Sequence, residues 1–140
     1  MMIADSLRWQ FDCAGVAWQA LEDLFSAAAL GGRKGGKIKR AFENSSVVCF
    51  GYDGTRLIAA ARALTDHEYH ATIYDVVVHP DLQRRGVGRR VLREILARLP
   101  VWRILLVADG EVRGFYEDAG FHSHGDMMAL VDGTKLYDST

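Results

Sequence analysis

The sequence predicts one α/β domain over residues 1–140, built on a mixed β-sheet with helices on both faces. Hydrophobic patterns along the chain follow the order strand, two helices, three strands, helix, strand, helix and strand. The segment 69–108 has a strand–helix–strand pattern, which calls for a parallel pair and a right-handed crossover. The chain has 140 residues, of which 49% are hydrophobic, and this suffices for one buried core.

The first third of the chain is rich in helix. Residues 7–11 alternate between apolar and polar side chains and predict a strand. Asp12 is the predicted N-cap of a helix over 14–30, which Gly31-Gly32 is expected to end. The basic, glycine-rich stretch 31–37 is either a solvated connector or a lid beside a binding site.

The rest of the chain alternates strands and helices. Hydrophobic patterns predict strands at 47–52, 55–64, 69–78, 102–108 and near 127–131. They predict a short helix that buries Ile38 and Phe42, and further helices at 89–99 and 111–119. Asp53-Gly54 is typical of a hairpin turn, because type I′ turns need positive φ. The short apolar run 102–108 is consistent with a central, buried strand.

Composition argues against several classes of protein. The formal net charge of -1 provides no basic field that would attract nucleic acid. No apolar run approaches the roughly 18 residues of a membrane span, and the first residues lack the pattern of a secretory signal. Cys13 and Cys49 are too few for a disulfide scaffold. We therefore expect a cytoplasmic protein that binds neither nucleic acid nor membranes.

The sharpest functional signal lies between a predicted strand and a predicted helix. It is the hexapeptide 83–88, Gln-Arg-Arg-Gly-Val-Gly. The first N–H groups of a helix have no partner inside the helix and lie at its positive end, so they can bind phosphate. Gly86 and Gly88 keep side chains away from such a ligand. The hexapeptide lacks the Gly-Lys-Ser/Thr of a Walker loop and the third glycine of a Rossmann fingerprint. On its own it would equally fit an ordinary turn at a helix start.

Two segments together resemble the GNAT family of N-acetyltransferases. Residues 75–88 resemble the family's motif A, Q/R-x-x-G-x-G/A after an apolar strand. Residues 114–121, Gly-Phe-Tyr-Glu-Asp-Ala-Gly-Phe, resemble motif B, F-Y-x-x-x-G-F. Within the family, residues 61–78 look like the plastid branch of plants, which includes serotonin N-acetyltransferases. The same strand is also similar to glucosamine-6-phosphate N-acetyltransferases, although Tyr74 stands where they have a glutamate.

This resemblance implies an acetyl-CoA-dependent enzyme that acetylates a primary amine. The sheet is expected to splay beside the strand 69–78, with Val76 and Val78 pairing with the pantetheine arm and backbone N–H groups of 84–89 binding the pyrophosphate. The implied cofactor-binding residues are Val76, Val77, Val78, Gln83, Arg84, Arg85, Gly86, Val87, Gly88, Arg89, Asp109 and Phe115. Asp109 stands where many members of the family have an asparagine.

Two residues are candidates for the chemistry of acetyl transfer. Tyr116 occupies the motif B position whose hydroxyl faces the sulfur of coenzyme A, and a phenol is protonated at neutral pH. The alternative is that Tyr116 only fills core. Asp75 lies in an apolar strand, where a carboxylate needs a partner or a purpose, and it is the candidate base or amine anchor. The alternative is a structural carboxylate bonded to the backbone or to an arginine.

The acceptor is less well defined by the sequence. A small or aryl-alkyl amine is the first expectation, with aromatic residues lining its pocket. A protein lysine or N-terminus is one alternative, and an acyl-CoA-binding module without catalysis is another. The turn residues His67, Glu68 and His70 form either a proton relay or a solvated turn, and no metal site is expected. By analogy with the family, a homodimer is expected.

Overall fold

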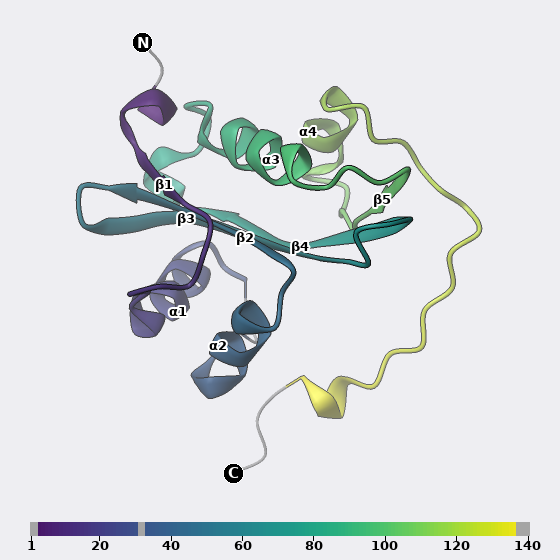
Figure 1. The fold of residues 1–140 in the computed structure, drawn as a ribbon, viewed down its shortest axis with the longest axis horizontal. Coiled ribbons are helices and arrows are strands. Elements are labelled where there is room, and N and C mark those ends of the chain that lie inside the picture. Colours follow the sequence, from purple (N-terminus) through teal and green to yellow (C-terminus); the bar gives the residue numbers. More distant parts are fainter. Residues whose placement is uncertain (1–2, 31–32, 137–140) are drawn as a thin grey trace.

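The computed structural model describes residues 3–30 and 33–136 and contains one mixed β-sheet between helical layers (Figure 1). The strands are β1 (Arg8–Gln10), β2 (Val47–Asp53), β3 (Arg56–Thr65), β4 (His70–Val78) and β5 (Arg103–Leu105). The α-helices are α1 (Trp18–Ala27), α2 (Gly35–Glu43), α3 (Val87–Ala97) and α4 (Arg113–Asp118). Three short 3₁₀ helices complete the described elements: η1 (Ile3–Ser6), η2 (Pro80–Leu82) and η3 (Gly133–Lys135). The predicted α/β fold is confirmed.

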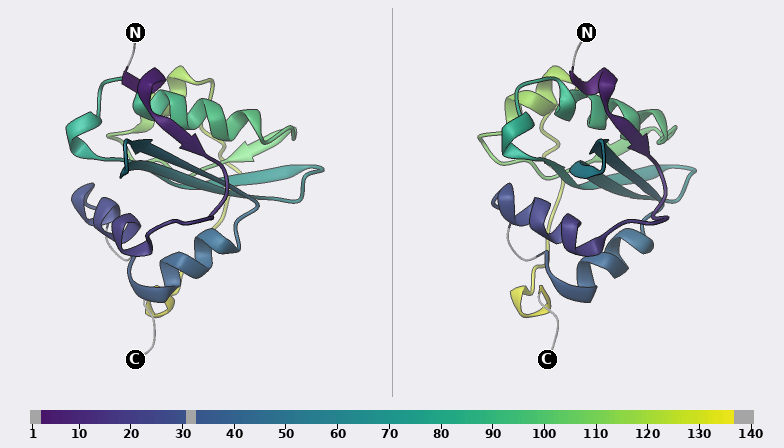
Figure 2. Two further views of the ribbon diagram at one scale, coloured as in Figure 1. Left: turned by 60° about the vertical axis from the view of Figure 1, so that its left-hand side comes forward. Right: turned by 90° about the vertical axis from the view of Figure 1, so that its left-hand side faces the viewer.

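The sheet separates two apolar cores. Figures 1 and 2 show α1 and α2 below the sheet and α3 and α4 above it. Phe25, Phe42 and Phe50 lie in the core under α1 and α2. Val91 and Ile95 of α3 lie in the other core. Because α3 buries Val91 and Ile95 at helical spacing and exposes Arg89 and Arg93 on the other face, packing against this sheet stabilises the helix.

The strands are arranged in chain order across the sheet, β1-β2-β3-β4-β5. The pairs from β1 to β4 are antiparallel, and β4 pairs with β5 in parallel, as the strand–helix–strand pattern predicted. The parallel pairing covers only the start of β4: His70, Ala71 and Thr72 pair with Arg103, Ile104 and Leu105. The rest of β4 is paired by β3 alone among the described strands, so the predicted splay is present.

A β-bulge interrupts β4 where it leaves β5. Ala60 pairs with Val77 and Arg62 pairs with Tyr74, so β4 carries one more residue than β3 between these pairs. Asp75 lies in this bulge with φ of 58°. The extra residue changes which face the side chains point to. Ile73 belongs to the α3-side core, whereas Val77 belongs to the core under α1 and α2.

The prediction of a central, buried strand over 102–108 is wrong. β5 spans only Arg103–Leu105 and forms an edge of the described sheet. Ile104 and Leu106 pack against the α3-side core, but Trp102 and Val107 are exposed. A short apolar run therefore did not distinguish a strand buried on both faces from one covered by helices on a single face.

The strand predicted near 127–131 is also absent from the described residues. The chain after α4 runs outside the sheet without regular pairing until η3 (Figure 1). Met128 and Leu130 are fully exposed. A strand needs a neighbouring edge for its backbone hydrogen bonds, and apolar composition alone does not supply one.

The start of α1 differs from the prediction. Asp12 is not its N-cap: the Asp12 carboxylate accepts the Ala14 N–H at 3.1 Å and the Gln10 amide, which forms a local turn. Gly15 follows with φ of 68°, and the helix begins only at Trp18, with Ala17 at the N-cap position. α1 ends at Ala27, and the expected stop at Gly31-Gly32 lies outside the described residues.

Candidate functional site

Helix α3 begins at Val87, within the hexapeptide 83–88. Gly86 is its N-cap in the left-handed conformation, with φ of 82°. The Arg90 N–H donates to the Gly86 carbonyl at 3.1 Å. The amides of Val87, Gly88 and Arg89 precede this bond and therefore face the helix end. A row of such amides at a positive helix end is suited to phosphate oxygens.

The arginines around this turn differ in the contacts that their side chains make. The side chains of Arg84, Arg85 and Arg89 are exposed. Arg90 is instead tied to the body of the protein: its guanidinium lies 3.5 Å from both Asp5 and Glu94 and stacks on the Trp9 ring. Arg90 therefore supports helix α3, and the positive charge offered to a ligand comes from the other three.

The end of β4 presents backbone groups to the open edge. The His79 N–H donates to the Ile58 carbonyl at 2.8 Å, so the backbone of residue 79 faces β3. Backbone groups alternate along a strand, so those of Val77 also face β3, and those of Val76 and Val78 face the open edge. The Gln83 amide donates to the Val78 carbonyl at 3.1 Å. The N–H groups of Val76 and Val78 and the carbonyl of Val76 are thus placed to pair with an extended ligand.

Phe115 closes the other side of this opening, and Tyr116 packs beside Phe115. The Phe115 ring lies near both Val78 and Gly88, which joins α4 to the end of β4 and the start of α3. Tyr116 packs edge-to-face between the Phe115 ring at 5.0 Å and the Phe121 ring at 5.9 Å. Burial raises the pKa of the Tyr116 phenol above its usual value, so it is protonated at neutral pH.

Asp75 points to the opposite face of the sheet. Its side chain is 6% exposed. Its Oδ2 accepts Arg62 Nε at 2.7 Å, and its Oδ1 accepts Arg33 Nη2 at 2.8 Å. The Arg62 guanidinium also stacks on the Tyr74 ring at 5.1 Å. Sequence reasoning missed Arg33 and Arg62, because a lone aspartate in an apolar strand signals a partner but does not tell which one.

Asp109 and the turn before β4 have local structural roles. Asp109 Oδ1 accepts the Glu111 N–H at 3.0 Å and so holds the turn before α4. Asp66 Oδ1 accepts the N–H groups of Glu68, Tyr69 and His70 within 3.1 Å, and these bonds lower the Asp66 pKa to about 2. The described residues contain no group of His, Cys, Asp and Glu side chains that could hold a metal ion.

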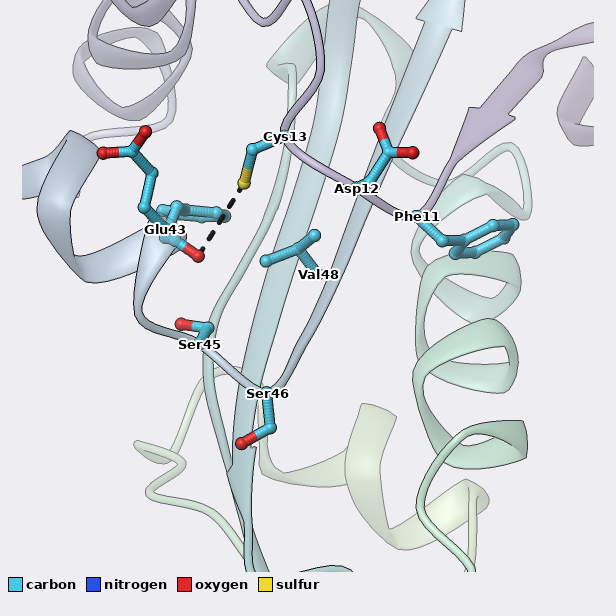
Figure 3. A pocket seen from close by; sticks show the side chains of 8 residues that line it. Phe11, Asp12, Cys13, Glu43, Ser45, Ser46 and Val48 are labelled. Atoms are coloured by element: carbon cyan, nitrogen blue, oxygen red, sulfur yellow. Dashed lines mark hydrogen bonds between the residues drawn. The ribbon is translucent and has the colours of Figure 1, made fainter.

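Two surface hollows lie elsewhere. One of about 420 Å³ is bordered by the segment after β1 and the end of α2 (Figure 3). Its lining residues are Phe11, Asp12, Cys13, Phe42, Glu43, Ser45, Ser46 and Val48. The other, of about 300 Å³, lies between β1, α1 and the β2–β3 hairpin. Neither contains a predicted site residue. The predicted cofactor-binding residues lie instead at the opening beside β4.

Comparison with known proteins decides the family. Residues 8–121 match the Acetyltransferase (GNAT) family. The chain belongs to this family. It is 37% identical over 92 residues to the uncharacterized N-acetyltransferase ycf52 of Porphyra purpurea, covering 61% of this chain and 53% of that protein. It is 36% identical over 116 residues to the chloroplastic serotonin N-acetyltransferase 2 of Oryza sativa, covering 78% of this chain and 58% of that one. The chain thus spans little more than half the length of these relatives.

Solved structures confirm the fold. A GNAT-family acetyltransferase from Streptococcus pneumoniae matches with a TM-score of 0.76 at 21% identity, over 89% of this chain and 96% of that one. The glucosamine-6-phosphate N-acetyltransferase of Arabidopsis thaliana matches with a TM-score of 0.63 at 15% identity, over 89% and 98%. At these identities the likeness concerns the fold alone. Among the described residues of this GNAT chain, no helix is long and apolar enough to span a membrane.

Proposed function

We propose that this GNAT protein transfers an acetyl group from acetyl-CoA to a primary amine. The observation that carries the proposal is the open edge of β4 beside the amide-lined start of α3. An extended arm and a diphosphate have complementary partners there in one continuous surface. When bound, acetyl-CoA supplies the acetyl thioester on which an amine acts. The residues present fit that group, because Gly86 frees the helix end and the carbonyl and N–H groups of Val76 remain at the edge.

The proposed roles in cofactor binding follow the elements. The amides of Val87, Gly88 and Arg89 would hold the diphosphate, with Arg84 and Arg85 adding charge. Gln83 would shape the edge through its bond to the Val78 carbonyl, 3.1 Å long. Val77 would support the edge from the core, where it is buried, and Phe115 would pack against the arm. Asp109 would order the loop before α4 through its own carboxylate.

We assign the role of general acid to Tyr116. Its half-buried phenol keeps its proton at neutral pH, and it lies on the α3 and α4 side of the opening. A proton donated by Tyr116 would stabilise a departing thiolate. Placement of the amine against the thioester would supply most of the remaining acceleration. Asp75 lies on the α1 and α2 side, where the amine would approach, and its part in holding the acceptor is developed below.

The acceptor class is proposed from the names of the relatives. The name of the rice relative includes serotonin, which supports an aryl-alkyl amine, and a soybean relative is named histone acetyltransferase TAP1. We favour a small amine, with a protein lysine or N-terminus as the second candidate. The cytoplasmic location and the homodimer stay predictions, since the names of the rice and Arabidopsis relatives place those proteins in the chloroplast.

The test is release of coenzyme A from acetyl-CoA in the presence of an amine panel. The panel holds serotonin, tryptamine, polyamines, glucosamine 6-phosphate, aminoglycosides and lysine peptides. We expect turnover of one class and a loss of roughly 10²–10⁴-fold in kcat for Tyr116→Phe, the range of acid catalysis. Tight binding of acetyl-CoA without turnover of any amine would favour the acyl-CoA-binding module instead.

A second variant tests the phosphate cradle separately. Gly86→Ala forces a residue with a Cβ atom into the left-handed region, at a cost of about 1–2 kcal/mol. We expect weaker binding of coenzyme A, measured by calorimetry. Gly125→Ala is the control, because nothing lies within 4 Å of its added Cβ atom and Gly125 has no positive φ. Equal affinities in both variants would show that the diphosphate does not bind at α3.

A further inference from the structure

Asp75 joins two arginines that are distant in sequence. Arg62 comes from the neighbouring strand β3, and Arg33 comes from the residues that lead into α2. The exposed fractions of the side chains are 6% for Asp75, 16% for Arg62 and 38% for Arg33. Each carboxylate oxygen has its own guanidinium, at 2.8 Å and 2.7 Å. The three side chains form one shielded network on the α1 and α2 face.

The bulge in β4 makes this network possible. In a regular strand, Asp75 would share a face with Ile73, in the apolar core under α3. The extra residue turns the Asp75 side chain toward the other face, next to Tyr74. The positive φ of 58° is uncommon for aspartate and is retained because both oxygens are bonded on this face. The bulge thus aims a carboxylate at α2.

The network fixes the start of α2 against β4. Arg33 directly precedes the N-cap Lys34, and its Nε and Nη2 both bond to Asp75 Oδ1. The Gly35 N–H also lies 3.4 Å from Glu22 Oε2 of α1. Arg62 meanwhile lies under the Tyr74 ring, which is 40% exposed, and over Phe42 of α2. One carboxylate therefore positions both a helix start and an exposed aromatic ring.

The location gives these contacts a role in the reaction. Tyr116 packs with the α3-side core, and Asp75 faces the opposite side of the sheet. The open edge of β4 lies between them. If the acetyl group is presented at that edge, the amine approaches along the face formed by Tyr74 and the start of α2. The position of that face decides how the amine is aligned.

We propose that Asp75 is a positioning residue for the acceptor, which acts through Arg33 and Arg62 rather than by taking the proton of the amine. Both carboxylate oxygens already accept from a guanidinium and the Asp75 side chain is only 6% exposed, so an arriving ammonium has little access to the carboxylate. Arg33 and Arg62 are then determinants of acceptor binding. This inference rests on the proposed function and specifies how its acceptor side is built.

The test is a double-mutant cycle on the amine that the wild type turns over. We expect Arg33→Gln and Asp75→Asn each to raise KM for the amine about tenfold, with a smaller change in kcat. The double variant should resemble either single variant, because residues in one network are non-additive. Arg33→Lys should raise KM for the amine less than Arg33→Gln does, since lysine keeps the positive charge but lacks the two N–H groups with which the guanidinium binds Asp75. Lys34→Gln, at the exposed neighbouring position, should match the wild type.

A catalytic base would give a different result. Asp75→Asn would then lower kcat and remove the acidic limb of the pH–rate profile, while Arg33→Gln would leave both unchanged. That outcome overturns the proposal, as does an additive double variant. Should Asp75→Asn fail to fold, the Arg33 variants decide, because Arg33 is partly exposed and its replacement leaves the cores intact.

A readout besides activity separates this inference from the proposed function. We expect amide exchange in α2 at Ile38 and Lys39 to accelerate in Arg33→Gln and in Asp75→Asn, and not in Lys34→Gln. If no amine is turned over but exchange responds in this way, the proposed function fails and the network still holds α2. If turnover is normal and neither KM nor exchange changes in Arg33→Gln, the positioning role is wrong.

Discussion

The Phe115 ring lies against Gly88: a Cβ atom added to Gly88 would stand 3.5 Å from Phe115 Cζ and 3.7 Å from Val78 Cγ2. These are ordinary van der Waals distances. Gly88 is therefore the point where α3, α4 and the end of β4 meet, on the side of the sheet that carries Tyr116. A methyl group fits this space, but a longer side chain does not.

The sequence assigned Gly88 to clearing space for the phosphates, but an added Cβ atom would face Phe115 and Val78 instead. Gly88→Ala should therefore leave the protein as stable as the wild type and keep the affinity for coenzyme A within about twofold. Gly88→Leu should displace Phe115, lower stability by about 1–3 kcal/mol and weaken binding of coenzyme A. Urea unfolding and calorimetry measure the two effects. Gly114→Leu is the control, because Gly114 lies in α4 with nothing within 4 Å of an added Cβ atom. A stable Gly88→Leu with normal affinity would contradict this arrangement of α4.

Asp66 should make stability depend on pH in the acid range. Its pKa is about 2 because its carboxylate accepts the N–H groups of Glu68, Tyr69 and His70, whereas the unfolded value is 3.8. A carboxylate whose pKa is lowered by folding stabilises the folded state at pH values above its pKa in the unfolded chain. This contribution is lost as the pH falls through its pKa in the folded protein. The stability difference between wild type and Asp66→Asn should therefore shrink between about pH 4 and pH 2.

NMR titration of the Asp66 side chain, together with urea unfolding at several pH values, measures this effect. Asp126→Asn serves as the control, since Asp126 lies in the exposed segment after α4. A difference between wild type and Asp66→Asn that stays constant from pH 5 to pH 2 would show that the three backbone bonds do not form in solution.

The two cysteines should differ in reactivity. Cys49 is fully buried in β2, and burial raises the pKa of its thiol to about 12. Cys13 is partly exposed, with Sγ 3.8 Å from the Phe42 carbonyl, and burial with Glu43 and Asp12 also raises its pKa. The thiolate is the reactive form, so a disulfide reagent should label Cys13 slowly and Cys49 not at all in the native protein.

Spectrophotometric thiol titration tests this difference. One slow equivalent is expected in buffer and two in denaturant, with the native equivalent absent from Cys13→Ser. Rapid labelling of two thiols in the native protein would mean that the sheet opens at β2. The same titration of Cys49→Ser should reproduce the native rate of the wild type, because the two thiols lie in different environments.

Sequence patterns predicted the parts of this protein that local physics determines. The glycine-bearing turn at Gly86, the parallel crossover and the burial of Ile38 and Phe42 follow from backbone freedom and hydrophobic period. The start of α1 was mispredicted because Asp12 is equally suited to a turn, and Gly15 decided between them. The network of Asp75 depends on a bulge and on pairing with Arg33, 42 residues away, and no local pattern encodes either.

The ionisation of Tyr116 should make the stability of the protein depend on pH in the alkaline range. Burial raises the pKa of its phenol above the usual value of 10 in the folded state. A group whose pKa is raised by folding contributes stability that is fully present below its pKa in the unfolded chain. This contribution is lost as the pH rises through its pKa in the folded protein. The stability difference between wild type and Tyr116→Phe should therefore fall above about pH 10. In a spectrophotometric titration, the phenolate signal absent from Tyr116→Phe should appear above the usual pKa of 10. If Tyr116 ionises at the usual pKa of 10, the phenol is solvated, and its assignment as the acid of the reaction would lose its physical basis.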